Sequence, residues 1–469
     1  MILLGLKTLM DAVNLKSNIN FLKVQKIIFI ALLAGLCAIF SLPNTIAIRY
    51  SVGTLFLILV VFLRPEWRLI VAANKIFLLF IAYIFLHFYF LTDHIPSGVF
   101  LINSQWLNFI LFSFLGFGVG SVCYKYKFKN LYLILGLAFS TPILIHAGQI
   151  FWQWQQSGMM PFAYRGIFPH HEMLGYAAIL AILFIGADFL FHSGGWLRKL
   201  ITLSVILLCL FSNILANGRA GFVFTIITVL TLVFFAIFFT KKYFDISIRK
   251  KLGLAFAVIL LGMAAIFIAS KYDGGRWKNT ISDLTSGFQI KDPLKAVCDG
   301  PQILKKQFHD SQESNSEIDT QINKFFSGDG SRTLVALASL EVLKKYPLGI
   351  DGSKNSYSIA VDLACGHPRY FKLEHAHNGW LNMSFAIGIP GAIIYLLLLV
   401  SYIKYAVSFI KEGNKNIYPE AMMLSSFAMI WILRAFFDDV HKDHMLQMQG
   451  FIMMLLFGYL ANYRKHQKI

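Results

Sequence analysis

Long apolar runs recur along most of this 469-residue chain, and many are long enough to cross a bilayer as a helix. Apolar residues make up 57% of the sequence, whereas charged residues make up only 14%. A soluble protein of this size could not bury so much apolar surface, so we expect an integral membrane protein. The first run lacks a persuasive small-residue cleavage site and is interpreted as a retained span rather than a signal peptide.

The runs predict an all-α, polytopic membrane protein with about twelve transmembrane helices. The expected spans are Ile27 to Leu42, Ile46 to Leu63, Ile76 to Leu91, Trp106 to Cys123, Leu131 to Trp152, Met173 to Phe191, Leu200 to Leu215, Ala220 to Thr240, Leu252 to Ala269, Trp380 to Tyr402, Ala421 to Phe437 and Met445 to Tyr463. The chain then divides into helices one to nine over 1–270, a large loop domain over 271–378, and helices ten to twelve over 379–469.

The formal net charge of +18 would suggest a nucleic-acid partner in a soluble domain. Here, however, Lys and Arg gather in every second connection between the spans, as in Lys125 to Lys129 and Lys241 to Lys251. By the positive-inside rule, both termini are cytoplasmic and the loop domain faces outward. No nucleic-acid partner is expected.

The loop domain is expected to contain one helix that begins near Arg332. Leucines recur there at near-helical spacing, at Leu334, Leu337, Leu340 and Leu343. Pro347 stops the helix, and Arg332 then lies in its first turn. Cys298 and Cys365 also fall in this polar segment. They could pair if the segment faces an oxidising compartment, and two unpaired thiols remain the alternative.

Three outward connections carry arginine or histidine. They contain Arg165, Arg219, and the pair Arg332 and His377. Two or three arginines near a histidine suit an anionic, phosphate-bearing substrate, because guanidinium groups bind phosphate oxygens in a bidentate manner. Taken singly, Arg219 could snorkel, Arg332 could be a solvated loop charge, and Arg165 could anchor its own turn.

Other polar clusters give weaker indications. His170, His171 and Glu172 could bind a metal, and so could Glu374, His375 and His377, but neither group has further ligands at convincing spacing. No metal and no cofactor are therefore expected. The outward cluster at Asp438 and Asp439, with His441 and His444, could bind an acceptor or a cation, but it is interpreted as a solvated loop between two spans.

One motif is more specific. His377-Asn378, followed after nine residues by Gly388 and then by Gly391, resembles the signature of the O-antigen ligase and polymerase superfamily (WaaL-like, Wzy_C). Three further segments resemble elements of that family in the same order: Arg165 to His170, Arg219 in Asn-Gly-Arg-Ala-Gly, and Arg332 with the later turn Tyr346-Pro347-Leu348-Gly349-Ile350. The sequence departs from the family at Pro169 to Glu172, where an Asn-Pro-Asn type of turn is expected.

The resemblance implies a GT-C-like glycosyltransferase with a periplasmic active site in a Gram-negative inner membrane. Its donor would be a glycan linked to undecaprenyl diphosphate, with Arg219, Arg332 and, more weakly, Arg165 binding the diphosphate. His377 would be the general base and His375 a supporting residue. Asn378, Gly388 and Gly391 would have structural roles within the motif. The reaction would be inverting, because no outward carboxylate is clearly placed as a nucleophile. It would be independent of metal, because Arg219 and Arg332 could neutralise the diphosphate.

Within the superfamily, the His-Ala-His-Asn-Gly form and the moderate length favour an O-antigen ligase that uses lipid A-core as acceptor. An O-antigen polymerase and a protein O-oligosaccharyltransferase remain alternatives. A transporter of lipid-linked sugars belongs to a different class. It should carry charges at mid-membrane and an inverted repeat, whereas the ionisable groups here gather at one interface.

Overall fold

The computed structural model describes residues 19–91, 105–168, 170–192, 195–238, 287–300, 330–372, 374–414, 416–439 and 443–467, together with isolated positions between 253 and 285. Every regular element in these residues is a helix. In chain order they are α2 (Ile19–Ile39), α3 (Ile46–Phe62), α4 (Arg68–Ala73), α5 (Lys75–Phe90), α7 (Trp106–Tyr126), α8 (Leu131–Ser157), α9 (Glu172–Phe191), α10 (Trp196–Leu215), α11 (Arg219–Phe238), α14 (Pro293–Asp299), α17 (Gly330–Lys345), α18 (Ser356–Cys365), α19 (Gly379–Glu412), α20 (Tyr418–Arg434) and α21 (Asp443–Gln467).

The all-helical, polytopic prediction is confirmed for the part of the chain that the structure describes. Six helices there are long and apolar enough to cross a membrane, namely α7, α8, α9, α10, α19 and α21. Four further expected spans coincide with the shorter helices α2, α3, α5 and α11, and another coincides with α20. The expected span at 252–269 falls mostly outside the described residues, so the total of twelve stays a prediction.

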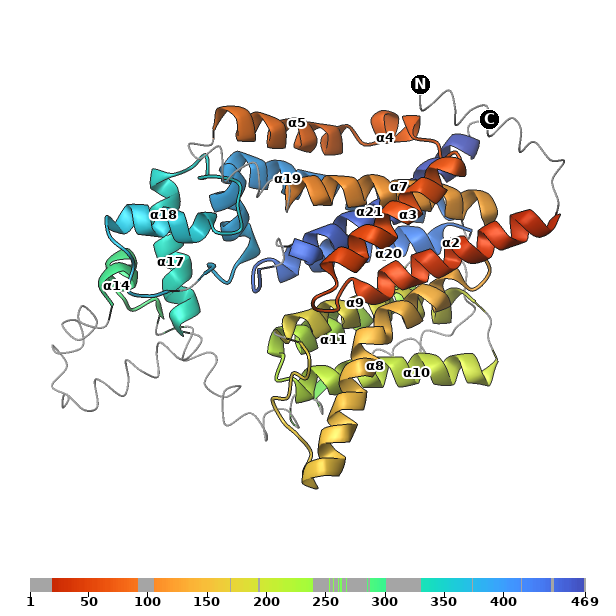
Figure 1. Ribbon diagram of the computed structural model, residues 1–469, viewed down its shortest axis with the longest axis horizontal. Helices are drawn as coiled ribbons and strands as arrows, with labels where there is room; N and C mark the ends of the chain where they lie inside the picture. Colours follow the sequence, from red (N-terminus) through yellow and green to blue (C-terminus); the bar gives the residue numbers. More distant parts are fainter. Residues whose placement is uncertain are drawn as a thin grey trace.

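Most of these helices form one bundle (Figure 1). Helix α9 lies at its centre and is buried from Met173 to Asp188. Helices α7 and α21 pack backbone to backbone, because α7 carries Gly116 and Gly120 where they meet. A Cβ at Gly116 would lie 2.2 Å from the carbonyl oxygen of Phe451, and one at Gly120 would lie 2.0 Å from that of Leu455. Small residues four apart are a common way for membrane helices to approach this closely.

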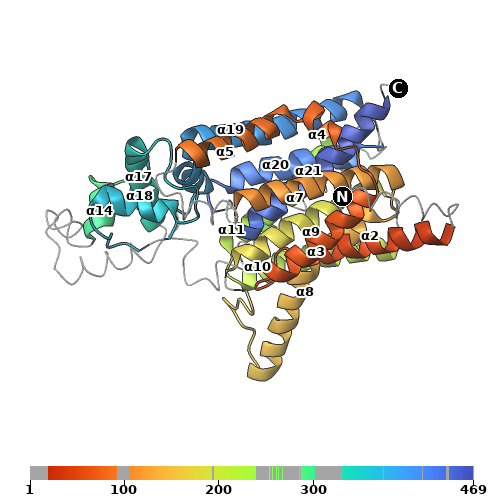
Figure 2. The same ribbon diagram turned by 45° about the horizontal axis from the view of Figure 1, so that its top comes forward.

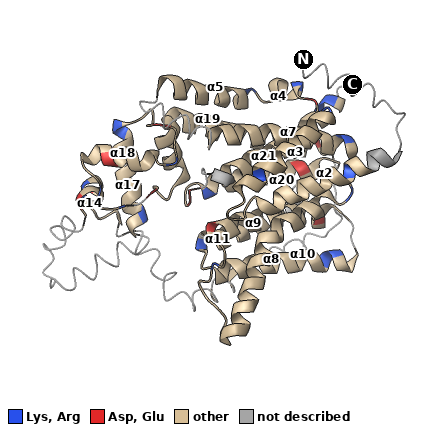
Figure 3. Ribbon diagram, in the orientation of Figure 1, with Lys and Arg blue, Asp and Glu red and all other residues tan. Residues whose placement is uncertain are grey.

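Helices α14, α17 and α18 form a separate group beyond one end of the bundle (Figures 1 and 2). The first described turn of α2 and the last turn of α21 lie at the opposite end. Lys and Arg residues mark the ends of α2, α7 and α10 there (Figure 3). This distribution agrees with the charge pattern on which the predicted topology rests.

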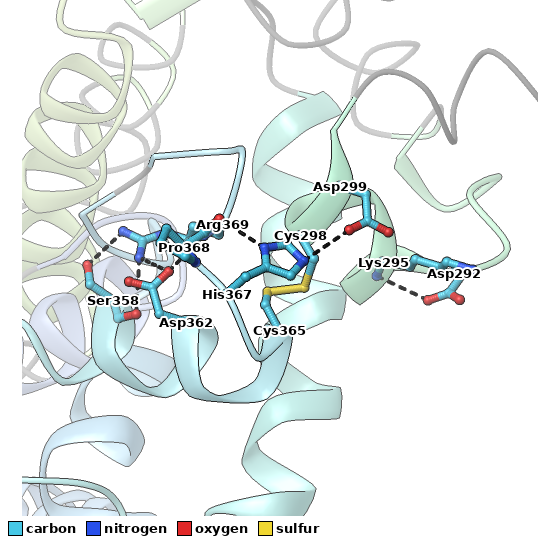
Figure 4. The surroundings of a disulfide bond; sticks show 10 residues. All are labelled: Asp292, Lys295, Cys298, Asp299, Ser358, Asp362, Cys365, His367, Pro368 and Arg369. Carbon is cyan, nitrogen blue, oxygen red and sulfur yellow. Dashed lines mark hydrogen bonds and ion pairs between the residues drawn. A yellow bond between two sulfur atoms is a disulfide. The ribbon is translucent and has the colours of Figure 1, made fainter.

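The α14, α17 and α18 group has its own apolar core, which includes Leu334, Val342 and Tyr357. The expected helix after Arg332 is α17, and it ends at Lys345 before Pro347. A disulfide joins Cys298 at the end of α14 to Cys365 at the end of α18 (Figure 4). We refer to residues 287–300 and 330–378 together as the loop domain.

The loop domain docks onto the bundle through a break in α19. Ile387 and Gly388 leave helical geometry, with φ of 76° and ψ of 164° at Gly388. The backbone groups freed by the break bond to the turn after α17. The Ile350 N–H donates to the Phe385 carbonyl oxygen at 2.8 Å, and the Ile389 N–H donates to that of Pro347 at 2.8 Å. This turn therefore replaces the helical hydrogen bonds that the break removes.

Two side chains of α5 also contact the place where the turn after α17 meets the break in α19, which we call the joint. The Tyr83 hydroxyl donates to the Ile387 carbonyl oxygen at 2.7 Å, and His87 Nε2 lies 2.7 Å from the carbonyl oxygen of Leu348. Gly391, three residues past the break, packs against the Tyr83 ring, because a Cβ there would lie 2.6 Å from it. Gly388 and Gly391 thus act in the packing of the loop domain and α5 against α19.

Candidate functional site

Arg165 lies on an exposed turn between α8 and α9 that the surrounding helices hold in place. The Tyr164 N–H donates to the Leu215 carbonyl oxygen at 3.1 Å, and the Tyr164 carbonyl oxygen lies 2.9 Å from His146 Nε2. On the other side, the Ile167 N–H donates to Gln149 Oε1 at 3.2 Å. Arg165 is exposed to solvent between these anchors. The turn therefore presents its guanidinium group from a fixed backbone.

Arg219 and Arg332 both lie in the first turn of a helix. Arg219 begins α11 after a tight turn in which Asn217 has a φ of 55° and the Gly218 N–H donates to the Asn213 carbonyl oxygen at 2.9 Å. Arg332 is the third residue of α17. Both side chains are partly buried. The two arginines come from different bodies, since α11 belongs to the bundle and α17 to the loop domain.

His171 lies at the start of α9, in contact with the turn that precedes Arg219. A Cβ on Gly218 would meet the His171 side chain at 3.4 Å. Burial lowers the pKa of His171 to about 4; Asp438 opposes this shift, and Arg165, Arg332 and Arg434 add to it. His171 is therefore neutral at neutral pH. Three arginines from separate parts of the sequence therefore act electrostatically on one imidazole.

Arg434, at the end of α20, was not among the predicted site residues. It is completely buried, and its guanidinium carbon lies 3.5 Å from the centre of the Tyr176 ring. Its Nη2 pairs with Asp438 at 3.2 Å and donates to the Glu172 carbonyl oxygen at 3.4 Å. Its Nε and Nη1 have no hydrogen-bond partner in the structure as described. The hydrogen bonds and the ion pair of this buried cation are therefore concentrated on Nη2.

The interpretation of Asp438 and Asp439 as a solvated loop was wrong. Their exposed fractions are only 4% and 5%. Asp438 is buried because it pairs with Arg434 and because its carbonyl oxygen accepts from the Gly379 N–H at 3.0 Å. A charged residue at the outer end of a span, with a carboxylate four residues later, is the sequence signal that would have found this pair. His441 lies outside the described residues, and the His444 side chain is not described either.

His377 is held in an unusual backbone conformation just before α19. Its φ is 50°, in the left-handed region that is uncommon for residues other than glycine. Both neighbours are anchored: the Ala376 N–H donates to Asn382 Oδ1 at 2.8 Å, and Asn378 Nδ2 donates to the Phe436 carbonyl oxygen at 3.1 Å. Strained residues persist where the surroundings fix them, often at functional sites.

Asn378 also caps α19, because its side chain accepts from the Leu381 N–H at 3.0 Å. Asn378, a residue of the motif, therefore has a structural role: its side chain connects the start of α19 to the end of α20. The rings of His375 and His377 lie with centroids 4.4 Å apart. Two imidazoles are thus adjacent at the end of the bundle where α20 ends and the loop domain begins.

Arg165, Arg332 and Arg434 thus all act electrostatically on His171, and the turn before Arg219 contacts the His171 side chain. The anchors of Asn378 and Gly379 tie the His377 segment to the loop after α20 that contains Asp438. Cys298, Cys365, Gly388 and Gly391 lie outside this group and hold the loop domain together or in place. No group of three His, Cys, Asp or Glu side chains gathers as a metal site in the described ranges.

Residues 203–396 match the family model Wzy_C, described as O-antigen ligase. This match supports membership of the O-antigen ligase and polymerase superfamily. No curated protein matches it. The segment matched to the superfamily includes Arg219, Arg332 and His377, whereas Arg165, His171 and Arg434 lie outside it. The fold therefore adds a histidine and two arginines from the flanking sequence to the superfamily segment.

Proposed function

We propose that the chain is an O-antigen ligase. It transfers O-antigen polysaccharide from undecaprenyl diphosphate to a sugar hydroxyl of lipid A-core, at the periplasmic face of a Gram-negative inner membrane, with both termini cytoplasmic. The observation that supports the proposal is that the turn before Arg219 contacts His171, on which Arg165, Arg332 and Arg434 also act electrostatically. The match to the O-antigen ligase family model supports the reaction class.

The arginines would act on the donor. A lipid-linked diphosphate carries several negative charges and becomes a good leaving group when they are neutralised. Arg219 and Arg332 would bind its oxygens, with a weaker contribution from Arg165 on its exposed turn. Because guanidinium groups stay charged and bind phosphate oxygens through two donors, they suit this task without a metal.

His377 would act on the acceptor. A sugar hydroxyl is a weak nucleophile, and a neutral imidazole can accept its proton as the bond forms. The acceptor oxygen would attack the anomeric carbon, the bond from that carbon to the diphosphate oxygen would break, and the proton would pass to His377. This direct displacement inverts the anomeric configuration. His375, with its ring 4.4 Å from that of His377, would support the base.

The first test is transfer of a carrier-linked glycan by the purified, reconstituted protein. His377→Ala should abolish transfer and leave membrane insertion intact. A matched control is His367→Ala, because His367 is also in the loop domain but is exposed and pairs with Asp299 at 3.2 Å (Figure 4). Wild-type transfer by the His377 variant would refute the role of the base. A transporter would still move its substrate without His377.

The acceptor is tested in cells. In a Gram-negative strain lacking this protein, lipopolysaccharide gels should show a lipid A-core without O-antigen, while long carrier-linked chains accumulate. A core that carries a single repeat unit would indicate a polymerase instead. An unchanged ladder would favour a protein O-oligosaccharyltransferase or a transporter.

The diphosphate site has its own test. Arg219→Ala and Arg332→Ala should weaken binding of undecaprenyl diphosphate, and Arg219→Lys should restore only part of it if the contact is bidentate. Arg64→Lys is a suitable control, because Arg64 is exposed and follows α3 in a predicted cytoplasmic connection. Unchanged carrier binding in both alanine variants would refute the site.

A further inference from the structure

A cavity lies among the ends of α7, α8, α9, α20 and α21, at the end of the bundle that carries the basic connections. Its volume is about 560 Å³. Five tyrosines line it, together with one glutamate and the flanking Lys127 and His192: the tyrosines are Tyr124, Tyr132, Tyr418, Tyr459 and Tyr463. None of these residues belongs to the candidate site described above.

Glu420 is the unusual residue among those that line the cavity. Its side chain is buried, with an exposed fraction of 3%. Tyr132 donates a hydrogen bond to Oε1 and Tyr459 also interacts with the carboxyl group, whereas Oε2 has no partner within hydrogen-bonding geometry. No Lys, Arg or His of the described chain forms an ion pair with it. Buried carboxylates are normally paired with a cation, because an uncompensated charge is expensive to remove from water.

The tyrosines that line the cavity favour the binding of a cationic ligand there. The Tyr124 ring stands edge-on to Tyr459 and to Tyr463, with centroids 5.5 Å and 6.2 Å apart. Tyrosine faces attract ammonium groups through the negative charge density of the ring. A carboxylate within a tyrosine-lined cavity therefore matches a primary ammonium group, which can also donate hydrogen bonds to both carboxylate oxygens.

We propose that this cavity binds the ammonium group of an ethanolamine-type headgroup, with Glu420 as its counter-charge. Lys127, exposed at the rim, would face the phosphate of that headgroup. The same chemistry could be supplied by a phospholipid of the adjacent leaflet or by a free amine. The site is independent of glycan transfer and would be a structural or regulatory contact at the far end of the bundle.

The test measures lipid binding to the full-length protein in detergent by native mass spectrometry. Phosphatidylethanolamine and phosphatidylglycerol with identical acyl chains are compared, since both carry a phosphate and only the first carries an ammonium group. The wild-type protein should prefer phosphatidylethanolamine. Glu420→Gln should weaken its binding about 10-fold or more, as expected for a charge-assisted hydrogen bond, and leave phosphatidylglycerol unaffected. Equal binding of the two lipids by the wild type would overturn the proposal.

Glu66→Gln is the matched control, because Glu66 lies at the same end of the bundle but is half-exposed and pairs with Lys465 at 2.9 Å. If Glu420→Gln does not fold, Tyr124→Leu removes one aromatic face and should also reduce the preference. An unchanged preference in Tyr124→Leu would refute the aromatic site. A melting shift with free ethanolamine would support the site and identify a soluble amine as its source, whereas a shift with the lipid alone would identify the headgroup.

Discussion

Replacing Gly388 with alanine is expected to undock the loop domain from the bundle. Gly388 has φ and ψ of 76° and 164°, a region that is essentially restricted to glycine. The new methyl group would lie 2.6 Å from the Leu348 carbonyl oxygen, which is backbone and cannot swing aside. The substitution therefore acts on the backbone of Gly388 and on the turn that docks against it.

Two contributions set the magnitude. The disfavoured backbone geometry costs about 1–3 kcal/mol. Moving the turn away breaks the hydrogen bonds that Ile350, Gly352 and Ile389 make across the joint, each 2.8 Å long and worth about 1 kcal/mol. The total is about 4–6 kcal/mol, which is comparable with the stability of a whole domain.

The assay is thermal unfolding of the purified protein in detergent, together with limited proteolysis at the turn that contains Leu348. Gly388→Ala should melt at a clearly lower temperature and be cleaved faster there. Gly35→Ala is the control, because Gly35 is inside α2 with no atom within 4 Å of the new methyl group. It should be neutral or stabilised by about 1 kcal/mol. A Gly388 variant that melts and resists protease like the wild type would refute this account of the joint.

Three further outcomes are expected. Asp438→Asn should destabilise the protein by about 3 kcal/mol in the same melting assay, because it leaves the buried Arg434 without its counter-charge; an unchanged melting temperature would mean that another group compensates. Stability should fall as the pH drops from about 6.5 toward 4, because an unfolded chain protonates His171 before the folded chain, whose His171 pKa is about 4. His171→Gln should make stability less dependent on pH in this range. An equally steep dependence in the variant would mean that other groups cause the loss of stability. Cys298→Ser should destabilise the loop domain by about 4 kcal/mol, because Cys298 and Cys365 close a loop with a sequence separation of 67; reductant should have the same effect on the wild type and none on the variant.

The sequence predicted the helices well because membrane spans are local. The length of an apolar run can be read from the sequence of that run alone, so α7 to α10 lie close to their expected positions. The same holds for α17, where leucine spacing and Pro347 mark both the helix and its end. The break in α19 near Gly388 also has a local cause, since Gly388 and Pro390 both weaken a helix.

The sequence could not predict what depends on contacts between distant segments. In the sequence, the turn at Leu348 and the glycine at 388 are separate local features. Only the fold shows that this turn packs into the break that Gly388 makes in α19. The same is true of Arg434, which reads as an outward cation in the sequence and is buried against Tyr176 in the structure. His171 gave a metal hypothesis, and only the fold shows that burial, with a smaller contribution from arginines, keeps it neutral.

The joint at the break in α19 also has a consequence for how the protein matures. The first turns of α19 share the loop-domain core, through Phe385, whereas the turns beyond Gly388 pack in the bundle core, as Tyr395 does. Arg332 and His377 enter on the loop-domain side, and Arg219 enters on the bundle side. If the proposed site and topology hold, a newly inserted chain would have no complete site until its outer segment has crossed the membrane, formed its disulfide and docked. Activity itself would then report the last step of assembly.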